Sequence, residues 1–193
     1  MCDLAQAIDA CTLCADRFAA TATAHRPRPV AWFRPNARIL IVGQAPGARV
    51  HASGVPFSDA SGDRLRAWMG VDGDTFRDIS RISIVPMAFC FPGYSTKGAD
   101  LPPPSICART WRAEVLGEIG PVPLTLLVGG HSQAWHLGAG RVGARVAEWC
   151  THAPAIFPLP HPSWRNTAWL AKHLWFEAEL LPALRTAVAE VLR

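Results

Sequence analysis

The sequence predicts an α/β fold, a three-layer α/β/α sandwich around a central parallel sheet of four strands. Four short apolar runs bounded by turn residues have the composition of buried strands. The stretches between these runs are long enough for helices and carry apolar residues at helical spacing. Strands that read as nearly continuous apolar runs are typical of parallel sheets, because helices cover both of their faces.

The predicted strands are the runs rich in Ile, Leu and Val. They cover residues 38–43 (RILIVG), 81–89 (RISIVPMAF), 123–130 (PLTLLVGG) and 154–163 (PAIFPLPHPS). Helices are predicted over residues 62–71, 105–119, 132–137 and 142–149. A last helix is expected to begin after Asn166 or Thr167 and to be interrupted near Pro182, because proline has no amide hydrogen to donate.

Length and composition predict a single domain over residues 1–193. Half of the 193 residues are hydrophobic, which is enough for one packed core. No run of about 18 apolar residues is present, and the first residues lack the basic and then apolar pattern of a signal peptide. We therefore expect a cytoplasmic protein without membrane contacts. Residues 20–37, rich in Pro, Ala and Arg, are expected to cross the surface in extended form.

Four cysteines are spaced as metal or cluster ligands. Cys11 and Cys14 are expected one helical turn apart, and Cys90 and Cys107 flank a loop rich in proline and glycine that can fold back on itself. Four thiolates bind either a 4Fe-4S cluster or a tetrahedral zinc ion. Zinc ribbons usually repeat the close cysteine pair, which this chain does not. Unrelated buried cysteines that act as small hydrophobic residues are the third interpretation.

The predicted sheet places a binding site at the carboxyl ends of its strands, where ligands bind in open α/β sheets. The segments that follow the strands are residues 44–62, 90–104, 129–131 and 161–166. We expect these segments to converge on one pocket. The small-residue stretch GQAPGARVHASGVPFSDASGD, residues 43–63, would then be one wall, and HPSWRN, residues 161–166, the opposite wall.

An ordered set of motifs in this chain resembles the iron-sulfur uracil-DNA glycosylases. The set consists of CTLC, ILIVGQAPG, GVPF, a cysteine followed by a proline-rich loop and a further cysteine, and HPS. The resemblance implies the uracil-DNA glycosylase-like sandwich and a DNA repair enzyme that hydrolyses the N-glycosidic bond of uracil, or of another deaminated base, flipped out of DNA. It also implies a 4Fe-4S cluster on Cys11, Cys14, Cys90 and Cys107, with structural zinc as the alternative.

The motifs combine features of two branches of these glycosylases. Gln44 stands where the family-four branch has a glutamate, Val50 and His51 where it has an acidic pair, and Pro86 where it has an asparagine on the second strand. SDASGDRL and HPSWRNT instead resemble the family-five branch, which keeps an aspartate in the first of these stretches. By that match, Asp59 takes the acidic catalytic role in this chain.

Asp59 and His161 are the predicted catalytic residues. The Asp59 carboxylate is expected to orient a water and to offset the positive charge that develops on the sugar. His161 is expected to donate a hydrogen bond to the base oxygen on which negative charge accumulates. Each residue also has a structural interpretation: Asp59 as the N-cap of the helix near Gly62, and His161 as a loop histidine fixed by Pro162.

Other residues of the two walls are expected to bind the substrate. Small residues let the backbone approach the base closely, and Phe57 either stacks on the base or packs in the core. Asn166 either meets the substrate or caps the final helix. The predicted substrate-binding residues are Gln44, Ala45, Pro46, Gly47, Phe57, Ser163 and Asn166; Trp164 and Arg165 are the predicted DNA-binding residues; Arg26, Arg28, Arg34 and Lys97 are candidates for phosphate contacts.

Two other functions stay open on the sequence. One is a non-catalytic DNA-binding module that retains the glycosylase fold and the cluster. The other is an unrelated nucleotide enzyme with structural zinc, although the GQAPG turn does not fit the Gly-x-Gly-x-x-Gly fingerprint. For the glycosylase we expect a monomer that is associated with the nucleoid, binds DNA and releases uracil as its small-molecule product.

Overall fold

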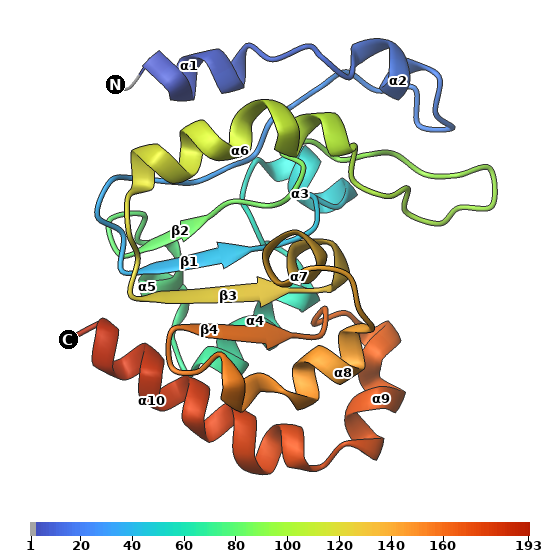
Figure 1. Cartoon of the computed structure of the whole chain (residues 1–193). Coiled ribbons are helices and arrows are strands. Elements are labelled where there is room, and N and C mark those ends of the chain that lie inside the picture. The colour runs from blue at the N-terminus through green and yellow to red at the C-terminus, as the bar shows by residue number, and fades with distance from the viewer. Residues whose placement is uncertain (1–2) are drawn as a thin grey trace.

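Four parallel strands form the centre of the molecule in the computed structural model, which describes residues 3–193 (Figure 1). The strands are β1 (Ile39–Val42), β2 (Ile82–Ile84), β3 (Leu124–Val128) and β4 (Ile156–Leu159), and their order in the sheet is β2-β1-β3-β4. Helices cover both faces. The predicted three-layer α/β/α sandwich is therefore confirmed, and each strand lies inside the apolar run that predicted it.

The helices connect the strands and enclose them. They are α1 (Asp3–Asp9), α2 (Ala15–Ala19), α3 (Ala48–Ser53), α4 (Ala60–Met69), α5 (Gly73–Arg77), α6 (Ser105–Ile119), α7 (Gly130–Leu137), α8 (Val142–Ala147), α9 (Thr167–Lys172) and α10 (Leu181–Val191). Residues 3–193 also contain two 3-10 turns, η1 (Trp149–Thr151) and η2 (Trp164–Asn166), and a π-helical segment, η3 (Phe176–Leu180). The helices predicted between the strands are all present, and α3 and α5 are additional short helices.

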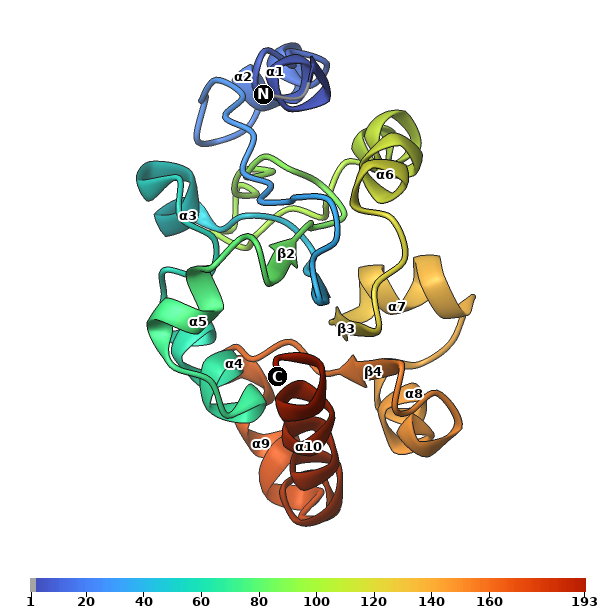
Figure 2. The same cartoon turned by 90° about the vertical axis from the view of Figure 1, so that its left-hand side faces the viewer.

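Alternate residues of each strand point into opposite layers, as the two-residue period of a strand requires. In β1, Ile39 and Ile41 belong to a core that α4, α5 and α10 complete, whereas Leu40 and Val42 belong to a second core with α1 and α6. Figure 2 shows α6 and α7 on one side of the sheet and α4, α5 and α10 on the other. The strands are buried on both faces, which explains their continuous apolar composition.

The last helix is interrupted earlier than predicted. The chain leaves helical geometry after α9, near His173, and then continues without a break from η3 into α10 across Pro182. Pro182 is tolerated because it follows directly on the π-helical turn, where the regular backbone hydrogen bonds are already shifted. The prediction of a break near Pro182 was therefore wrong.

The CTLC pair is also not helical. Cys11 and Cys14 lie in the turn between α1 and α2, which the hydrogen bond from the Ala15 amide to the Thr12 carbonyl closes at 2.9 Å. The prediction of two thiols one helical turn apart was therefore wrong. Two short helices, α1 and α2, are joined by this turn, and both cysteine side chains line the same pocket.

The segment from residue 20 to residue 37 has no helix and follows the predicted extended path. Its Trp32 pairs with Ile84 of β2 in an antiparallel bridge, so the segment covers the edge of the sheet. The Arg28 guanidinium donates hydrogen bonds of 2.6 Å to the carbonyls of His51 and Ala52 at the end of α3. These two hydrogen bonds from Arg28 anchor the segment to α3. None of the helices within residues 3–193 is both long and apolar enough to cross a membrane.

A buried pair joins α6 to α7. Arg112 is 2% exposed, and its guanidinium lies 2.9 Å from Nε2 of His136. Because arginine only donates, His136 accepts with an unprotonated Nε2. Burial, followed by the charge of Arg112, lowers the pKa of His136 from 6.5 to about 4. The imidazole is therefore neutral in the folded protein and carries a proton in the unfolded chain at mildly acidic pH.

Acid should destabilise the protein through this pair. Between pH 6.5 and about 4 the unfolded chain binds the proton that folded His136 rejects, so the free energy of unfolding falls as the pH falls. We expect His136→Gln, whose side-chain oxygen still accepts from Arg112, to flatten this dependence. Thermal unfolding midpoints measured from pH 7 to pH 4 test the prediction. Parallel pH profiles for the wild type and the variant would contradict it.

Candidate functional site

A cavity of about 720 Å³ opens at the carboxyl ends of the strands. Residues that follow each of the four strands line it, as do residues of the stretch 92–103. The structure places all eleven predicted catalytic, substrate-binding and DNA-binding residues on this one cavity: Gln44, Ala45, Pro46, Gly47, Phe57, Asp59, His161, Ser163, Trp164, Arg165 and Asn166.

Asp59 is both the N-cap of α4 and part of the cavity wall. Its Oδ1 accepts a hydrogen bond of 3.2 Å from the Gly62 amide, as an N-cap side chain does. Its carboxylate also lines the cavity. The N-cap predicted from the sequence is confirmed, and the cap uses one carboxylate oxygen and leaves the second one. The cap holds the carboxylate in one orientation at the end of a rigid helix.

Phe57 reaches the cavity through a strained backbone. Its φ is 51°, a left-handed conformation that costs bulky residues free energy. The ring packs edge-on against Phe76 at 6.0 Å and lies beside Gly43. Gly62 makes this geometry possible, because a Cβ at that position would lie 1.8 Å from the Phe57 carbonyl oxygen. Phe57 thus packs in the core and also lines the cavity.

Gly62→Ala should displace Phe57. The new methyl group overlaps the Phe57 carbonyl group, so either the Phe57 backbone or the start of α4 must shift. We expect a loss of about 1–3 kcal/mol in the free energy of unfolding. Denaturant unfolding measures the effect.

Gly117→Ala is the matched control for this substitution. Gly117 lies inside α6, and a Cβ there meets nothing within 4 Å. We expect this variant to gain up to about 1 kcal/mol, because alanine favours the helix over glycine. Equal stability of Gly62→Ala and the wild type would contradict the argument.

His161 is held in one tautomer. The Ser163 amide donates a hydrogen bond of 3.2 Å to Nδ1 of His161, so Nδ1 carries no proton in the neutral ring. The proton of the neutral ring is therefore on Nε2, which makes that nitrogen a donor. Burial lowers the pKa of His161, and the nearby charges of Asp59 and Asp100 oppose this effect. The imidazole is thus neutral near pH 7.

The loop that carries His161 is fixed by its neighbours. Asn166 Nδ2 donates a hydrogen bond of 2.7 Å to the His161 carbonyl, and Arg64 of α4 donates one of 3.0 Å to the Ser163 carbonyl. Asn166 therefore stabilises the HPSWRN loop and makes no side-chain cap of α9. Because Arg64 and Asp59 belong to the same end of α4, these contacts place Asp59 and His161 relative to one another.

The rim of the cavity carries an ion pair that the sequence did not predict. Arg165 lies 3.5 Å from the Asp100 carboxylate, and both side chains are more than half exposed. The Arg165 guanidinium also lies over the Trp164 ring, whose residue is 77% exposed. Tyr94, Asp100 and His131 also line the cavity, although the sequence did not single them out. They lie in residues 90–104 and 129–131, two segments that were expected to meet at this edge of the sheet. That expectation was the available signal for all three.

The wall opposite the HPSWRN loop is built by close backbone packing. Gly129, with φ of 87°, accommodates the Gln44 side chain, which a Cβ at that position would approach to 2.7 Å. Pro86 lines the same cavity after β2. The Gln44 side chain therefore packs against the end of β3, and the backbone and small side chains of residues 45–47 form the wall beside it.

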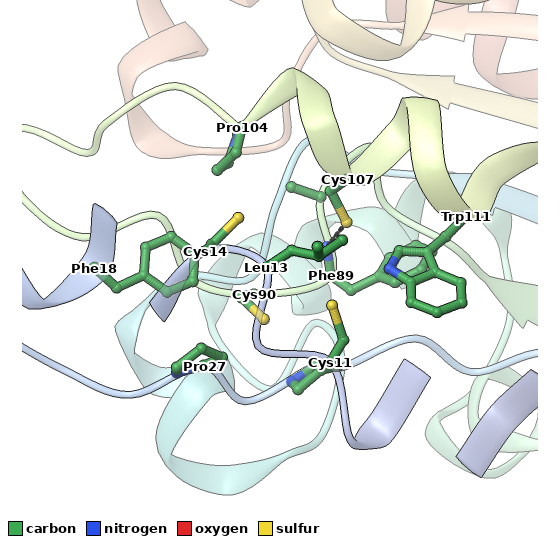
Figure 3. A pocket seen from close by; sticks show the side chains of 12 residues that line it. Cys11, Leu13, Cys14, Phe18, Pro27, Phe89, Cys90, Pro104, Cys107 and Trp111 are labelled. Atoms are coloured by element: carbon green, nitrogen blue, oxygen red, sulfur yellow. Dashed lines mark hydrogen bonds between the residues drawn. The ribbon is translucent and has the colours of Figure 1, made fainter. Parts of the chain in front are cut away.

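The four predicted ligand cysteines line a second, smaller pocket. Cys11, Cys14, Cys90 and Cys107 come from the α1–α2 turn, the loop after β2 and the first turn of α6. Figure 3 shows their four sulfur atoms arranged around one space, with the side chain of Leu13 drawn between them. No disulfide joins the described cysteines, and Cys150 is exposed and separate. Cys2 lies outside the described residues.

Two of the four thiols resist ionisation in this pocket. Burial, with added repulsion from the other cysteines, raises the pKa of Cys90 to about 12 and that of Cys107 to about 11. These thiols are therefore protonated near neutral pH unless a bound cation holds them as thiolates. Within residues 3–193, no three His, Cys, Asp or Glu side chains are grouped tightly enough to bind one metal ion.

A zinc ion and a 4Fe-4S cluster require different spacings of their four thiolates. Zn–S bonds of about 2.3 Å draw four thiolates tightly together. In a 4Fe-4S cluster each thiolate binds a different iron, so the sulfurs stay farther apart. The indole Nε1 of Trp111, which lines the pocket, is buried without an acceptor among the described residues, and a metal-bound sulfur would satisfy it. By donor type the four cysteines fit either a 4Fe-4S cluster or a zinc ion.

A comparison with protein families agrees with this geometry. The model of the Uracil DNA glycosylase superfamily matches residues 30–185. The chain belongs to the uracil-DNA glycosylase superfamily. Membership points to DNA glycosylase chemistry, the hydrolysis of a base–sugar bond during DNA repair, with DNA as the partner. The matched range contains every residue of the 720 Å³ cavity and begins after Cys11 and Cys14.

Proposed function

We propose that this member of the superfamily is a uracil-DNA glycosylase that hydrolyses the N-glycosidic bond of uracil flipped out of DNA. The observation that carries the proposal is the placement of Asp59 and His161 on one cavity, where the Asp59 charge acts on the His161 ring. A carboxylate and a neutral histidine donor are the two groups that match the charges of the transition state.

The flipped base is held by shape and stacking. Phe57 offers its ring as the stacking surface, an interaction of about 1–3 kcal/mol per base. The backbone of residues 44–47 forms the wall beside the base, where small side chains allow a close approach. Because the strained Phe57 backbone and Gly62 fix the ring before binding, little ordering is needed when the base enters.

Asp59 acts on the sugar side of the bond. Its Oδ1 is held by the Gly62 amide, and no described residue donates to the second oxygen. That oxygen is available to orient a water toward the sugar carbon as the bond to the base breaks. The negative charge of the carboxylate also offsets the positive charge that grows on the sugar.

His161 acts on the base side. With Nδ1 held by the Ser163 amide, Nε2–H donates to the base oxygen on which negative charge accumulates. The donor is neutral, so it stabilises the departing anion without first needing a proton from solvent. Protonation of Nδ1 would break the bond to Ser163, which keeps the ring neutral over a wider pH range.

The exposed rim faces the DNA backbone. Trp164 projects from the HPSWRN loop and is placed to fill the gap that the flipped nucleotide leaves. Arg165 can exchange Asp100 for a phosphate, because an exposed ion pair costs little to separate. Binding should therefore weaken steeply as salt is added.

The four cysteines are proposed to hold a 4Fe-4S cluster, with structural zinc as the alternative. When bound, the cluster cross-links the α1–α2 turn to the loop after β2 and to α6. Cys90 and Cys107 border the segment that contributes Tyr94 and Asp100 to the cavity. The cysteines thereby hold one wall of the site. Iron and zinc analysis of protein purified without oxygen distinguishes the two metals.

The test uses oligonucleotides with a single uracil, single-stranded and double-stranded, and matched oligonucleotides with thymine. Alkali then cleaves the strand wherever a base has been released. We expect cleavage of the uracil oligonucleotides and no cleavage of the thymine oligonucleotides. Inosine and xanthine substrates extend the panel to other deaminated bases. Salt-sensitive DNA binding without release of any base would contradict the proposal and would favour the non-catalytic DNA-binding module.

A further inference from the structure

Trp111 presents an unused hydrogen-bond donor to the cysteine pocket. It lies four residues after Cys107 on α6, so the two side chains share one face of the helix. Both line the pocket, and Figure 3 shows the Trp111 ring beside Cys107. The indole Nε1 is buried and meets no acceptor among residues 3–193. A buried N–H without an acceptor costs about 1–3 kcal/mol, so an acceptor is expected in the pocket.

Arg112, the residue after Trp111 on α6, is a buried positive charge that does not itself line the pocket. Its residue is 2% exposed, and no carboxylate of the described residues forms an ion pair with it. Its NH1 lies 3.5 Å from the Pro86 carbonyl, its NH2 contacts His136, and its Nε has no partner in the described part of the chain. A buried cation without a counterion is strongly unfavourable.

A single bound group could satisfy the Trp111 N–H and compensate the charge of Arg112. That group must be negatively charged and must offer hydrogen-bond acceptors in the pocket. A cluster with four thiolate ligands has a net negative charge, and its sulfurs accept hydrogen bonds that set its stability and potential. Trp111 and Arg112 follow Cys107 on α6, so one helix supplies a ligand, a donor and a compensating charge.

We propose that Trp111 and Arg112 form the outer shell of the four-cysteine site, with the indole N–H donating to a cluster sulfur and the guanidinium balancing the negative charge. This inference rests on the cluster proposed above. It also links the two sites, because Arg112 contacts the carbonyl of Pro86, a residue of the base cavity. Both are positioning residues and neither touches the substrate.

The test compares the iron-loaded wild type with Trp111→Phe and Arg112→Met. Phe keeps the ring but removes the N–H, and Met keeps most of the length of the side chain but removes the charge. We expect each variant to lose iron to a chelator about tenfold faster, the usual size of an outer-shell effect. The reduction potential should fall in both variants, because a hydrogen bond and a positive charge each favour the reduced cluster.

A spectroscopic measurement distinguishes a hydrogen bond from Trp111 to the cluster from a role of Trp111 in packing alone. Exchange into D₂O should shift the Fe–S stretching bands of the wild type, and the shift should shrink in Trp111→Phe. Trp135→Phe is the control, since Trp135 is half exposed on α7. Unchanged iron loss and unchanged bands in Trp111→Phe overturn the inference but not the cluster. A wild type with zinc or no metal overturns both, and uracil release, measured separately, still tests the glycosylase.

Discussion

Asp59→Asn is expected to lower the rate of uracil release by about 10²–10⁴-fold, the usual contribution of a positioned acid or base. The asparagine has no charge to offset that of the sugar and is a weak acceptor for the attacking water. It is nevertheless as good an N-cap as aspartate, so the hydrogen bond to the Gly62 amide and the start of α4 should remain. Single-turnover release from a uracil oligonucleotide measures the loss.

Asp72→Asn is the matched control for this experiment. Asp72 is the N-cap of α5 and accepts a hydrogen bond of 2.7 Å from the Thr75 amide, as Asp59 does from Gly62, but it does not line the cavity. We expect wild-type activity and similar stability for this variant. If Asp59→Asn kept full activity, or lost it only in proportion to a loss of folded protein, Asp59 would be a structural cap without a catalytic role.

Cys90→Ser and Cys107→Ser are expected to lose most of the bound iron and to unfold at much lower temperature. In a site of this kind the free energy of metal binding contributes to folding, and loss of a metal site is among the few changes that cost more than about 4 kcal/mol. For a chain of this length that corresponds to a fall of about 8–16 °C in the unfolding midpoint. Iron content and thermal unfolding measure the two effects.

Cys150→Ser controls for the loss of a cysteine as such. Cys150 is exposed in the η1 turn and lies outside the cysteine pocket. It should retain wild-type iron content and stability. Cys90→Ser with normal iron and an unchanged unfolding midpoint would contradict a ligand role, and the four cysteines would then be better described as buried apolar residues.

The strands were predictable because their signal is local. Ile39 and Ile41 point to one layer and Leu40 and Val42 to the other, so the whole of β1 must be apolar wherever it lies in the sheet. The end of α9 was harder to predict. The break there falls near His173, before the π-helical segment, and the helix continues across Pro182.

The candidate site was predictable where it follows the ends of strands. Asp59 and His161 belong to motifs that adjoin the sheet edge, and parallel strands bring their carboxyl ends to one side. Asp100 lies in residues 90–104, which were expected to reach the pocket, but it was not singled out because no local pattern describes the path of this loop. The antiparallel bridge between Tyr94 and Asp100 folds that loop back, and this places Asp100 beside Arg165.

Apolar runs and glycine-rich turns in the sequence were enough to specify the layers, the strands and the edge at which a ligand binds. Only the tertiary structure showed that the Ser163 amide selects the His161 tautomer and that Gly62 makes room for Phe57. It also showed that the Trp111 Nε1 is buried in the cysteine pocket without an acceptor and that neighbouring Arg112 is buried without an ion pair. The physical reason is the separation along the chain over which each of these effects acts. Periodicity and turn preference act over a few neighbouring residues, whereas tautomers, close contacts and unpaired buried groups depend on atoms that folding brings together from distant segments.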